Sequence, residues 1–201
     1  MSNDPKTGRP VQERAKRTRH AIMLAAADAF AAQGYAAASM TDIASRAGVT
    51  KGALAFHFPA KRDLAVALVE AFDRDRDDLL ARLEPQSGLA MIWSVLQSLA
   101  TQFRDDPVIR AAVRLQNESS SIDAPLPPRY AGWIGTFTDL YARAASDGSL
   151  RPEFDPATLG RLTVAAFFGI QHVSEALTGR ADIHDRLREF WDLFQLAVRT
   201  T

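Results

Sequence analysis

Apolar residues recur at helical spacing along most of the chain, beginning in its N-terminal part. From about Gln12 onward, residues three and four positions apart form one apolar face: Ile22, Ala26, Ala29 and Phe30. Gly34 follows this face, and glycine commonly ends a helix. The pattern predicts a first helix from about residue 12 to residue 34.

Two short helices are predicted next, with a glycine between them. Ser39 offers an N-cap to a helix over residues 41–47. Gly48 interrupts the pattern, and Thr50 offers an N-cap to another helix that runs to about Phe58. A short helix, a turn at glycine and a second short helix have the spacing of a helix-turn-helix.

The rest of the chain continues the helical pattern. A fourth helix starts near Lys61, and apolar stripes predict five more, over residues 89–103, 107–117, 130–141, 156–178 and 183–198. Strand alternation, internal repeats and coiled-coil heptads are absent from the sequence. We therefore predict an all-α protein of about nine helices, with a three-helix N-terminal domain and a larger helical domain behind it.

Charge divides the chain unevenly, although the formal net charge is zero. Residues 1–62 contain ten lysines and arginines and four acids, which leaves fourteen basic and twenty acidic residues in the remainder. This asymmetry predicts that the N-terminal part meets a polyanion. Residues 1–11 contain two prolines and a glycine and predict a flexible basic arm. Its Arg9 would either enter a minor groove or simply add charge.

The composition excludes several classes of protein. The chain has no cysteine, so it has no disulfides and no thiolate chemistry, which fits a reducing cytoplasm. It shows no signal peptide and no run of eighteen apolar residues for a membrane span. The motifs of serine hydrolases, zinc peptidases, phosphate loops and dinucleotide sites are absent. We expect a cytoplasmic protein that is not an enzyme and has no cofactor and no membrane partner.

Three features could suggest a metal ion. Residues 73–84 place acids at the spacing of a calcium loop, but Asp78 occupies the position that needs glycine, and charges four apart are typical of an exposed helix face. His57 has no second ligand at helical spacing, so a histidine that faces DNA or packs between helices explains it better. His172 lies among apolar residues and is interpreted as a core or interface histidine. We expect no metal site.

The stretch GVTKGALAFHF, residues 48–58, combines features that DNA contact requires. Three apolar residues would anchor its helix: Val49, Leu54 and Phe58. Thr50, Lys51, Gly52 and Ala53 would face outward at the N-terminal end, where the helix attracts a phosphate and small side chains let the backbone come close. Glycine inside a helix costs about 1 kcal/mol relative to alanine, which is reasonable only if something must approach closely.

The segment TDIASRAGVTKGALAFHFPAKRDLA, Thr41–Ala65, resembles the signature of the TetR family of bacterial transcriptional regulators. Its GVTKGAL and FHF parts, together with FFGIQHVSEALTGRADI at residues 167–183, are similar to the γ-butyrolactone receptor subgroup. The resemblance implies a homodimer. A helix-turn-helix DNA-binding domain would span residues 12–60, and a ligand-binding and dimerisation domain, whose last two long helices pair across the dimer axis, would span residues 61–201.

The resemblance and the charge pattern together predict the residues that contact a near-palindromic double-stranded operator. They are Arg17, Ser39, Thr41, Thr50, Lys51, Gly52, Ala53, His57 and Lys61. The family usually has a tyrosine that touches the DNA backbone where this chain has Ala55. This departure predicts weaker or altered operator affinity.

The ligand site is expected around Trp133, because the butyrolactone receptors have a tryptophan at the matching place in their ligand cavity. Spacing alone would make Trp133 a core residue. The full set expected to line an apolar cavity is Trp93, Leu96, Leu99, Phe103, Val113, Trp133, Thr136, Phe137, Phe167 and Gln171. Phe168 stands where the receptors often have a smaller polar residue, so the class of ligand stays open.

Two functions are compatible with these patterns. The first is a ligand-responsive repressor that a small lipophilic effector, such as a γ-butyrolactone-type signal, releases from its operator. The second is a helical sensor or carrier that holds a ligand but binds DNA weakly or not at all, and Ala55 is the argument for it.

Overall fold

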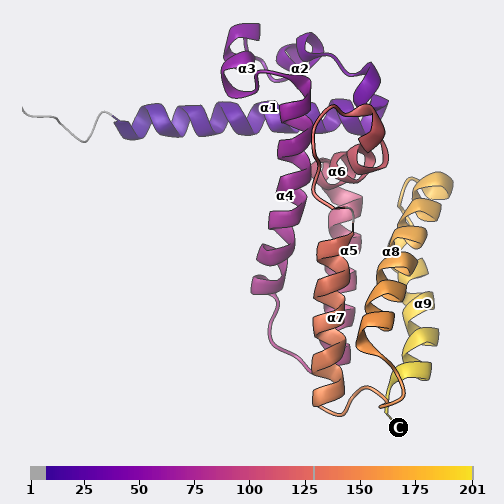
Figure 1. Ribbon diagram of the computed structural model, residues 1–201. Helices are drawn as coiled ribbons and strands as arrows, with labels where there is room; N and C mark the ends of the chain where they lie inside the picture. Colours follow the sequence, from indigo (N-terminus) through magenta and orange to yellow (C-terminus); the bar gives the residue numbers. More distant parts are fainter. Residues whose placement is uncertain (1–7, 129, 201) are drawn as a thin grey trace, which may run out of the picture. The chain divides into compact units, whose positions relative to one another are not determined.

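Helices make up most of the chain in the computed structural model, which describes residues 8–128 and 130–200 (Figure 1). These residues form nine α-helices and one short 3-10 helix, Ser119–Ser121, with a single isolated bridge between Leu150 and Arg199 in place of any sheet. None of the described helices has the length and apolar character needed to cross a membrane. The prediction of an all-α protein of about nine helices is confirmed.

The chain forms two compact units. The first unit, Met1–Phe72 with Pro107–Pro127, contains α1 (Gly8–Ala37), α2 (Met40–Arg46), α3 (Lys51–His57), the first half of α4 (Lys61–Arg82) and α6 (Pro107–Asn117). The second unit, Asp73–Asp106 with Pro128–Thr201, contains the rest of α4, α5 (Gly88–Asp105), α7 (Ala131–Ser146), α8 (Pro156–Thr178) and α9 (Ile183–Val198). The units therefore do not divide the chain at residue 60, because α6 packs against α1.

Helix α1 begins at Gly8, four residues before the predicted start. Residues 8–11 of the predicted flexible arm are therefore helical, which corrects that expectation, and residues 1–7, together with the expected arm they would form, lie outside the described residues. Pro10 is compatible with this early start because the N–H groups of a helix's first turn have no intrahelical partner. The predicted glycine does interrupt the helix, since Gly34 has φ 81° and ψ 174°.

The helix-turn-helix forms as its capping residues predict. The Ser39 Oγ accepts a 3.1 Å hydrogen bond from the amide of Asp42, and the Thr50 Oγ1 accepts one of 3.1 Å from the amide of Ala53. Between them Gly48 has φ 66°, a left-handed conformation that favours glycine. Side chains from both short helices are buried, namely Ile43, Ala44, Leu54 and Phe58.

The second unit is a helical bundle in which α8 packs closely on α7, and α5 packs on α7 and α9. A Cβ atom on Gly160 of α8 would lie 2.6 Å from the Thr138 Oγ1 and 2.9 Å from the Thr138 backbone nitrogen, so glycine allows the two helices to approach. The buried Tyr141 hydroxyl and the Thr163 Oγ1 form a 2.8 Å hydrogen bond across the same contact.

Candidate DNA and effector sites

The outer surface of α3 is the best candidate for contact with DNA. Thr50, Lys51 and Gly52 are exposed at its N-terminal end, while Ala53 and His57 are half-buried. A Cβ atom on Gly52 would meet nothing closer than the Thr50 Oγ1 at 4.0 Å, so the space beside this glycine is open. The exposure of Thr50, Lys51 and Gly52 agrees with the outward face predicted for this end of the helix, whereas Ala53 is less exposed than predicted.

Three more predicted DNA contacts lie in the same compact unit. Ser39 and Thr41, at the start of α2, are exposed, although the Ser39 hydroxyl is already used to cap that helix. Arg17 is exposed on α1. Two residues after it, the Arg19 guanidinium lies over the Phe58 ring, with its Cζ 4.9 Å from the ring centroid. This contact ties α1 to the C-terminal end of α3.

The position of Lys61 supports a different role from the predicted DNA contact. Its ammonium donates hydrogen bonds to three carbonyl oxygens at the end of α1, those of Tyr35 at 2.7 Å, Ala36 at 3.2 Å and Ala38 at 2.9 Å. It also lies 4.5 Å from the centroid of the Tyr35 ring. A lysine ammonium has three N–H donors, so these bonds use its full capacity. Lys61 therefore caps the C-terminal end of α1.

One exposed side chain on α3 was not predicted. Phe56 is 82% exposed, and its ring meets the edge of the His57 ring at a centroid distance of 5.3 Å. The signal was available in the sequence, because Leu54 and Phe58 are buried at a spacing of four and the residue halfway between them must point away.

No metal site is found where the sequence raised the question. Within the described part of the chain, no group of three or more His, Asp or Glu side chains could hold an ion. Residues 73–82 lie inside α4 and not in a loop, and Arg76 there pairs with Asp73 and Asp77. His172 is exposed on α8, so it is not a core histidine, and its interpretation as an interface histidine stays a prediction.

The predicted effector residues divide between the two units. Nine of them lie in the second unit, on α5 (Trp93, Leu96, Leu99, Phe103), α7 (Trp133, Thr136, Phe137) and α8 (Phe167, Gln171). Val113 lies on α6 in the first unit. The Phe103 and Phe167 rings meet edge to face at 5.2 Å, and the Trp133 and Phe137 ring centroids are 6.2 Å apart.

Trp93 packs differently from the other aromatic candidates. It is half-buried and stacks on Trp191 of α9, with ring centroids 5.7 Å apart and an angle of 16° between the planes. The Arg188 guanidinium lies 5.9 Å from the Trp93 ring. Trp93 therefore belongs to the contact between α5 and α9, a partner that the spacing of α5 alone could not identify.

Gln171 is the most informative polar candidate. Its side chain is 4% exposed, and its Oε1 has no hydrogen-bond partner among the residues that the structure describes. Leaving a buried acceptor unsatisfied costs about 1–3 kcal/mol, so the group needs an explanation such as a ligand donor. The neighbouring Phe168 is half-buried, with its ring 4.4 Å from Tyr130 and 5.7 Å from Phe103.

A groove of about 360 Å³ opens elsewhere in the second unit, between the end of α4, α5 and α7. Its lining includes Leu80, Met91, Leu140 and Arg143, and Thr136 is the predicted effector residue that reaches it. The other predicted residues of α5, α7 and α8 lie in the core of the bundle, and seven of them are buried.

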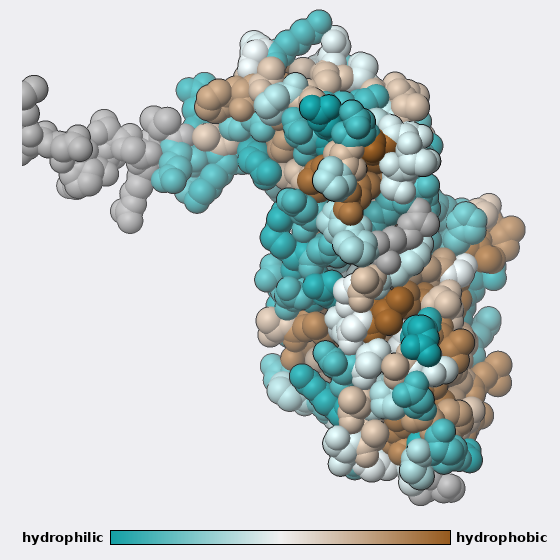
Figure 2. Space-filling model, in the orientation of Figure 1, coloured by the Kyte–Doolittle hydropathy of each residue, from teal (hydrophilic) through white to brown (hydrophobic). Residues whose placement is uncertain are grey.

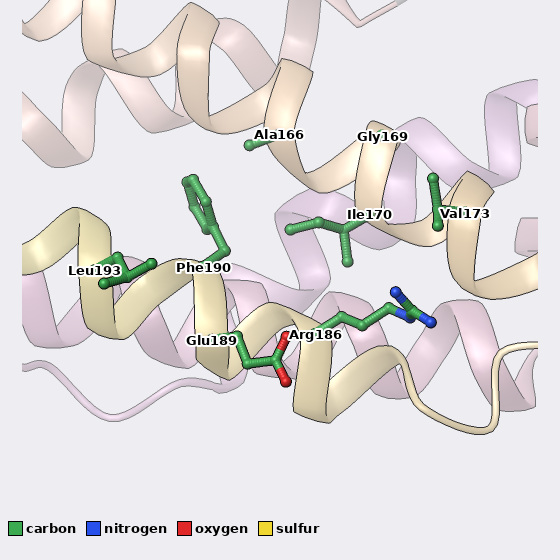
Figure 3. A pocket seen from close by; sticks show the side chains of 8 residues that line it. All are labelled: Ala166, Gly169, Ile170, Val173, Arg186, Glu189, Phe190 and Leu193. Carbon is green, nitrogen blue, oxygen red and sulfur yellow. The ribbon is translucent and has the colours of Figure 1, made fainter.

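Helices α8 and α9 carry an exposed apolar face. Its most exposed members are Leu162, Val173, Leu177, Leu193 and Leu196, between 44% and 75% exposed. Figure 2 shows hydrophobic residues over these helices, and Figure 3 shows the groove of about 480 Å³ between them, with Ile170 and Phe190 facing each other across it and Arg186 and Glu189 along one side. We call this surface the α8–α9 face.

A polar cluster in the first unit was also missed. The Glu118 carboxylate accepts hydrogen bonds from the Tyr35 amide at 2.6 Å and from the Arg114 Nε at 2.9 Å. Arg114 also donates to the Ala31 carbonyl at 2.7 Å. The pair of Arg114 and Glu118 is visible in the sequence as charges four apart, but its partners on α1 lie 83 residues away along the chain.

Comparison with known proteins gives matches over most of the chain. The family described as "Bacterial regulatory proteins, tetR family" matches residues 22–68, and "Tetracyclin repressor-like, C-terminal domain" matches residues 86–200. The chain is 34% identical over 180 residues to the A-factor receptor protein of Streptomyces griseus, a match that covers 90% of this chain and 63% of that protein. The chain thus spans less than two thirds of the length of this relative.

Solved structures agree with this assignment. One that concerns the control of antibiotic production by bacterial hormones has a TM-score of 0.85 at 43% identity, over 91% of this chain and 98% of that one. An ArpA-like γ-butyrolactone receptor has a TM-score of 0.81 at 30% identity, over 94% and 91%. CprB of Streptomyces coelicolor, in complex with its operator sequence, has a TM-score of 0.76 at 30% identity, also over 94% and 91%. The chain belongs to the TetR family of bacterial regulatory proteins.

Proposed function

We propose that this protein is a ligand-responsive transcriptional repressor that acts in the cytoplasm. A homodimer would bind a near-palindromic operator, and a small lipophilic effector of the γ-butyrolactone type would release it. The observation that carries the proposal is the open N-terminal end of α3, where Thr50, Lys51 and Gly52 are exposed in a helix-turn-helix.

The N-terminal end of α3 would make the central DNA contact. The first amides of a helix attract a phosphate, and the side chain of Lys51 adds a positive charge beside them. With no side chain at Gly52, nothing prevents the backbone from approaching the edge of a base or a sugar. Arg17 and His57 would add contacts to the backbone, and Lys61 would hold the end of α1 in place.

The dimer contact would lie on the α8–α9 face. A protein that acts as a monomer rarely exposes five large aliphatic side chains on two adjacent helices. A second copy would cover them in a four-helix contact with two-fold symmetry. The two α3 helices would then reach half-sites about 34 Å apart, one helical turn of DNA, or a multiple of that distance.

The effector site is proposed within the aromatic core of the second unit. A lactone ring or acyl chain would pack on the flat indole of Trp133, and a donor on the effector would satisfy Gln171. The relatives named as an A-factor receptor and a γ-butyrolactone receptor support this class of effector.

The effector would release the protein from its operator because it binds the released form more tightly than the DNA-bound form. Helix α4 runs without a break from the first unit into the second, and a single residue, Asp106, joins α5 to α6. A shift of these helices on ligand binding would change the distance between the two α3 helices of the dimer, so that they would no longer match the spacing of the half-sites. The effector can displace the equilibrium only by as much as it prefers the released form.

The test starts from the purified full-length protein. Genomic DNA fragments that it retains would be sequenced, and a shared inverted repeat would be confirmed by fluorescence anisotropy. Release would be measured with a panel of γ-butyrolactones, and a ligand that co-purifies would be identified by mass spectrometry. Retention of no specific fragment would contradict the repressor. A bound lipophilic ligand in that same preparation would favour the sensor or carrier, for which Ala55 on the exposed face of α3 is the supporting observation.

A further inference from the structure

The amino-terminal part of α1, residues 12–21, is a charged rod. No side chain in these ten residues is buried, and the first buried residue of the helix is Ile22. Figure 1 shows this part of α1 extending past α2 and α3, and Figure 2 shows its hydrophilic surface. Because it buries no apolar side chain, core packing does not explain why it continues as a helix. We call residues 12–21 the basic extension.

The charge on the basic extension is not neutralised by its own sequence. It contains four cations, Arg14, Lys16, Arg17 and Arg19, against the single acid Glu13. Lys16 pairs with Glu13 at 3.5 Å, with both side chains mostly exposed. Among the described residues, Arg14 and Arg17 have no acidic partner. Each pair of like charges three positions apart, such as Arg14 and Arg17, destabilises a helix by about 0.2–0.5 kcal/mol. An external polyanion would relieve this repulsion.

The basic extension is anchored beside α3. Arg19 lies over Phe58, the C-cap residue of α3, and the helix continues from there back to Gly8. The ten residues of the basic extension span about 15 Å as an α-helix. Duplex DNA presents one negative charge per ~1.7 Å of its axis, so this length corresponds to roughly nine phosphate charges.

We infer that the basic extension binds the phosphate backbone of the DNA that flanks each half-site. The inference rests on the proposed function and adds a second contact to it, outside the bases that α3 reaches. The position next to α3 identifies duplex DNA as the occupant, together with Arg14 and Arg17, which lie three positions apart on one side of the helix and have no acidic partner among the described residues. An anionic membrane or an acidic protein surface would offer charge but would not explain the position beside α3.

The experiment compares two duplexes made from the operator selected with this protein. One contains only the inverted repeat, and the other adds ten base pairs of arbitrary sequence on each side. Affinity of the full-length dimer is measured by anisotropy across a range of salt concentrations. We expect the flanked duplex to bind about tenfold more tightly at low salt, with a salt slope steeper by about two to four units, because each phosphate contact contributes about 0.9.

Matched variants identify the residues that cause the tighter binding to the flanked duplex. Arg14→Gln combined with Lys16→Gln should reduce the difference in slope between the two duplexes while keeping affinity for the short one. The control carries the same loss of charge on exposed residues of the second unit, Arg82→Gln and Arg143→Gln, and should retain the preference for flanks.

Each outcome decides the inference. Wild-type protein that binds the short duplex but gains nothing from flanks would overturn it and leave the proposed function intact. A control variant that loses the flank effect as fully as the extension variant would also overturn it, because net charge would then be the cause. Failure of the wild-type protein to bind either duplex would contradict both proposals. Retention on vesicles of anionic lipid without any flank effect would identify a membrane as the occupant instead of DNA.

Discussion

The backbone amide of Tyr35 donates a 2.6 Å hydrogen bond to the carboxylate of Glu118, and so joins the end of α1 to the end of α6. The same carboxylate accepts from Arg114, which in turn donates to the Ala31 carbonyl. A side chain at Gly34 would collide with this cluster, since a Cβ atom there would lie 2.7 Å from the Glu118 Oε1. Helix α1, which carries Arg17 and the basic extension, is therefore held by a charge-assisted network as well as by apolar packing.

The first prediction concerns acid stability. Burial opposes ionisation of Glu118, but the hydrogen bonds from Tyr35 and Arg114 and the charge of Arg114 outweigh it, so the pKa of Glu118 is lowered from its ordinary value of 4.5. A lowered carboxyl pKa in the folded state contributes stability above pH 4.5 that is lost as the pH falls through the folded value. Glu118→Gln should therefore lower the free energy of unfolding by roughly 1–2 kcal/mol at neutral pH and flatten its acid dependence below pH 4.5. Urea unfolding from pH 3 to pH 7 measures both, and a variant with unchanged acid dependence would contradict the role of this carboxylate.

The second prediction distinguishes Lys51 from Lys61, which were both predicted from the sequence to contact DNA. Lys51→Ala should weaken binding to all DNA sequences similarly and reduce the salt slope by about one unit, because one phosphate contact is lost. Lys61→Met should leave the slope unchanged and lower the melting temperature by roughly 2–4 °C, because it uncaps α1 at a cost of about 1 kcal/mol. Anisotropy titrations at several salt concentrations and thermal unfolding distinguish the two. A reduced slope in Lys61→Met would show that its ammonium reaches DNA.

The third prediction concerns close approach at Gly52. A leucine there enters open space in the free protein, since the nearest atom to an added Cβ is 4.0 Å away. Gly52→Leu should fold with a melting temperature close to that of the wild type and lose specific DNA binding by at least a hundredfold. Ala55→Leu, a change of similar size on an exposed position of the same helix, is the control and should have a smaller effect. Equal losses in both variants would argue against a special approach at Gly52.

The fourth prediction concerns the α8–α9 face. Leu177 and Leu193 are 67% and 75% exposed in the single chain, so their replacement should not disturb its core. The double variant Leu177→Asp, Leu193→Asp should be a folded monomer in sedimentation or light scattering at micromolar concentration, and it should bind a full operator much more weakly. Ala90→Asp, exposed in the first turn of α5, is the control and should remain dimeric. A wild-type protein that is monomeric under these conditions would refute the proposed dimer.

The fifth prediction concerns Gln171. If its buried Oε1 is unsatisfied without ligand, then Gln171→Met should keep or raise the free energy of unfolding, because it removes the unpaired group at nearly constant volume. The same change should raise the effector concentration needed for release of DNA by about tenfold. Trp133→Phe is a better second variant than Trp133→Ala, because Trp133 is only 3% exposed and truncation to alanine would lower the free energy of unfolding by about 3–5 kcal/mol. Destabilisation of Gln171→Met with an unaltered effector response would show that the amide is structural.

Local chemistry allowed the sequence to determine the helix-turn-helix. The caps at Ser39 and Thr50 and the positive φ at Gly34 and Gly48 depend on groups within a few residues, so their pattern is readable in one dimension. The exposure of Lys51 follows from helical periodicity once Leu54 and Phe58 are assigned to the core. The family signature covers this same segment, which is why the fold and the candidate DNA contacts could be predicted together.

Only the tertiary structure decided how residues distant in sequence are paired. The carbonyls that Lys61 caps are 23 to 26 residues away, the partner of Glu118 on α1 is 83 residues away, and Trp93 stacks on Trp191. No periodicity within one helix contains this information.

Helix α8 shows most clearly what helical periodicity cannot determine. Its apolar residues predicted a helix over residues 156–178 without assigning each of them to the core or to a partner; Leu162, Val173 and Leu177 are exposed, and the structure buries Thr163, Phe167 and Gln171. A helix that is apolar around most of its circumference has two faces that can be covered, and periodicity cannot assign one of them to the chain's own core. The packing of α7 against Gly160 makes that choice, because a glycine on this face lets the two backbones come close, and the other face carries the exposed residues of the proposed dimer contact.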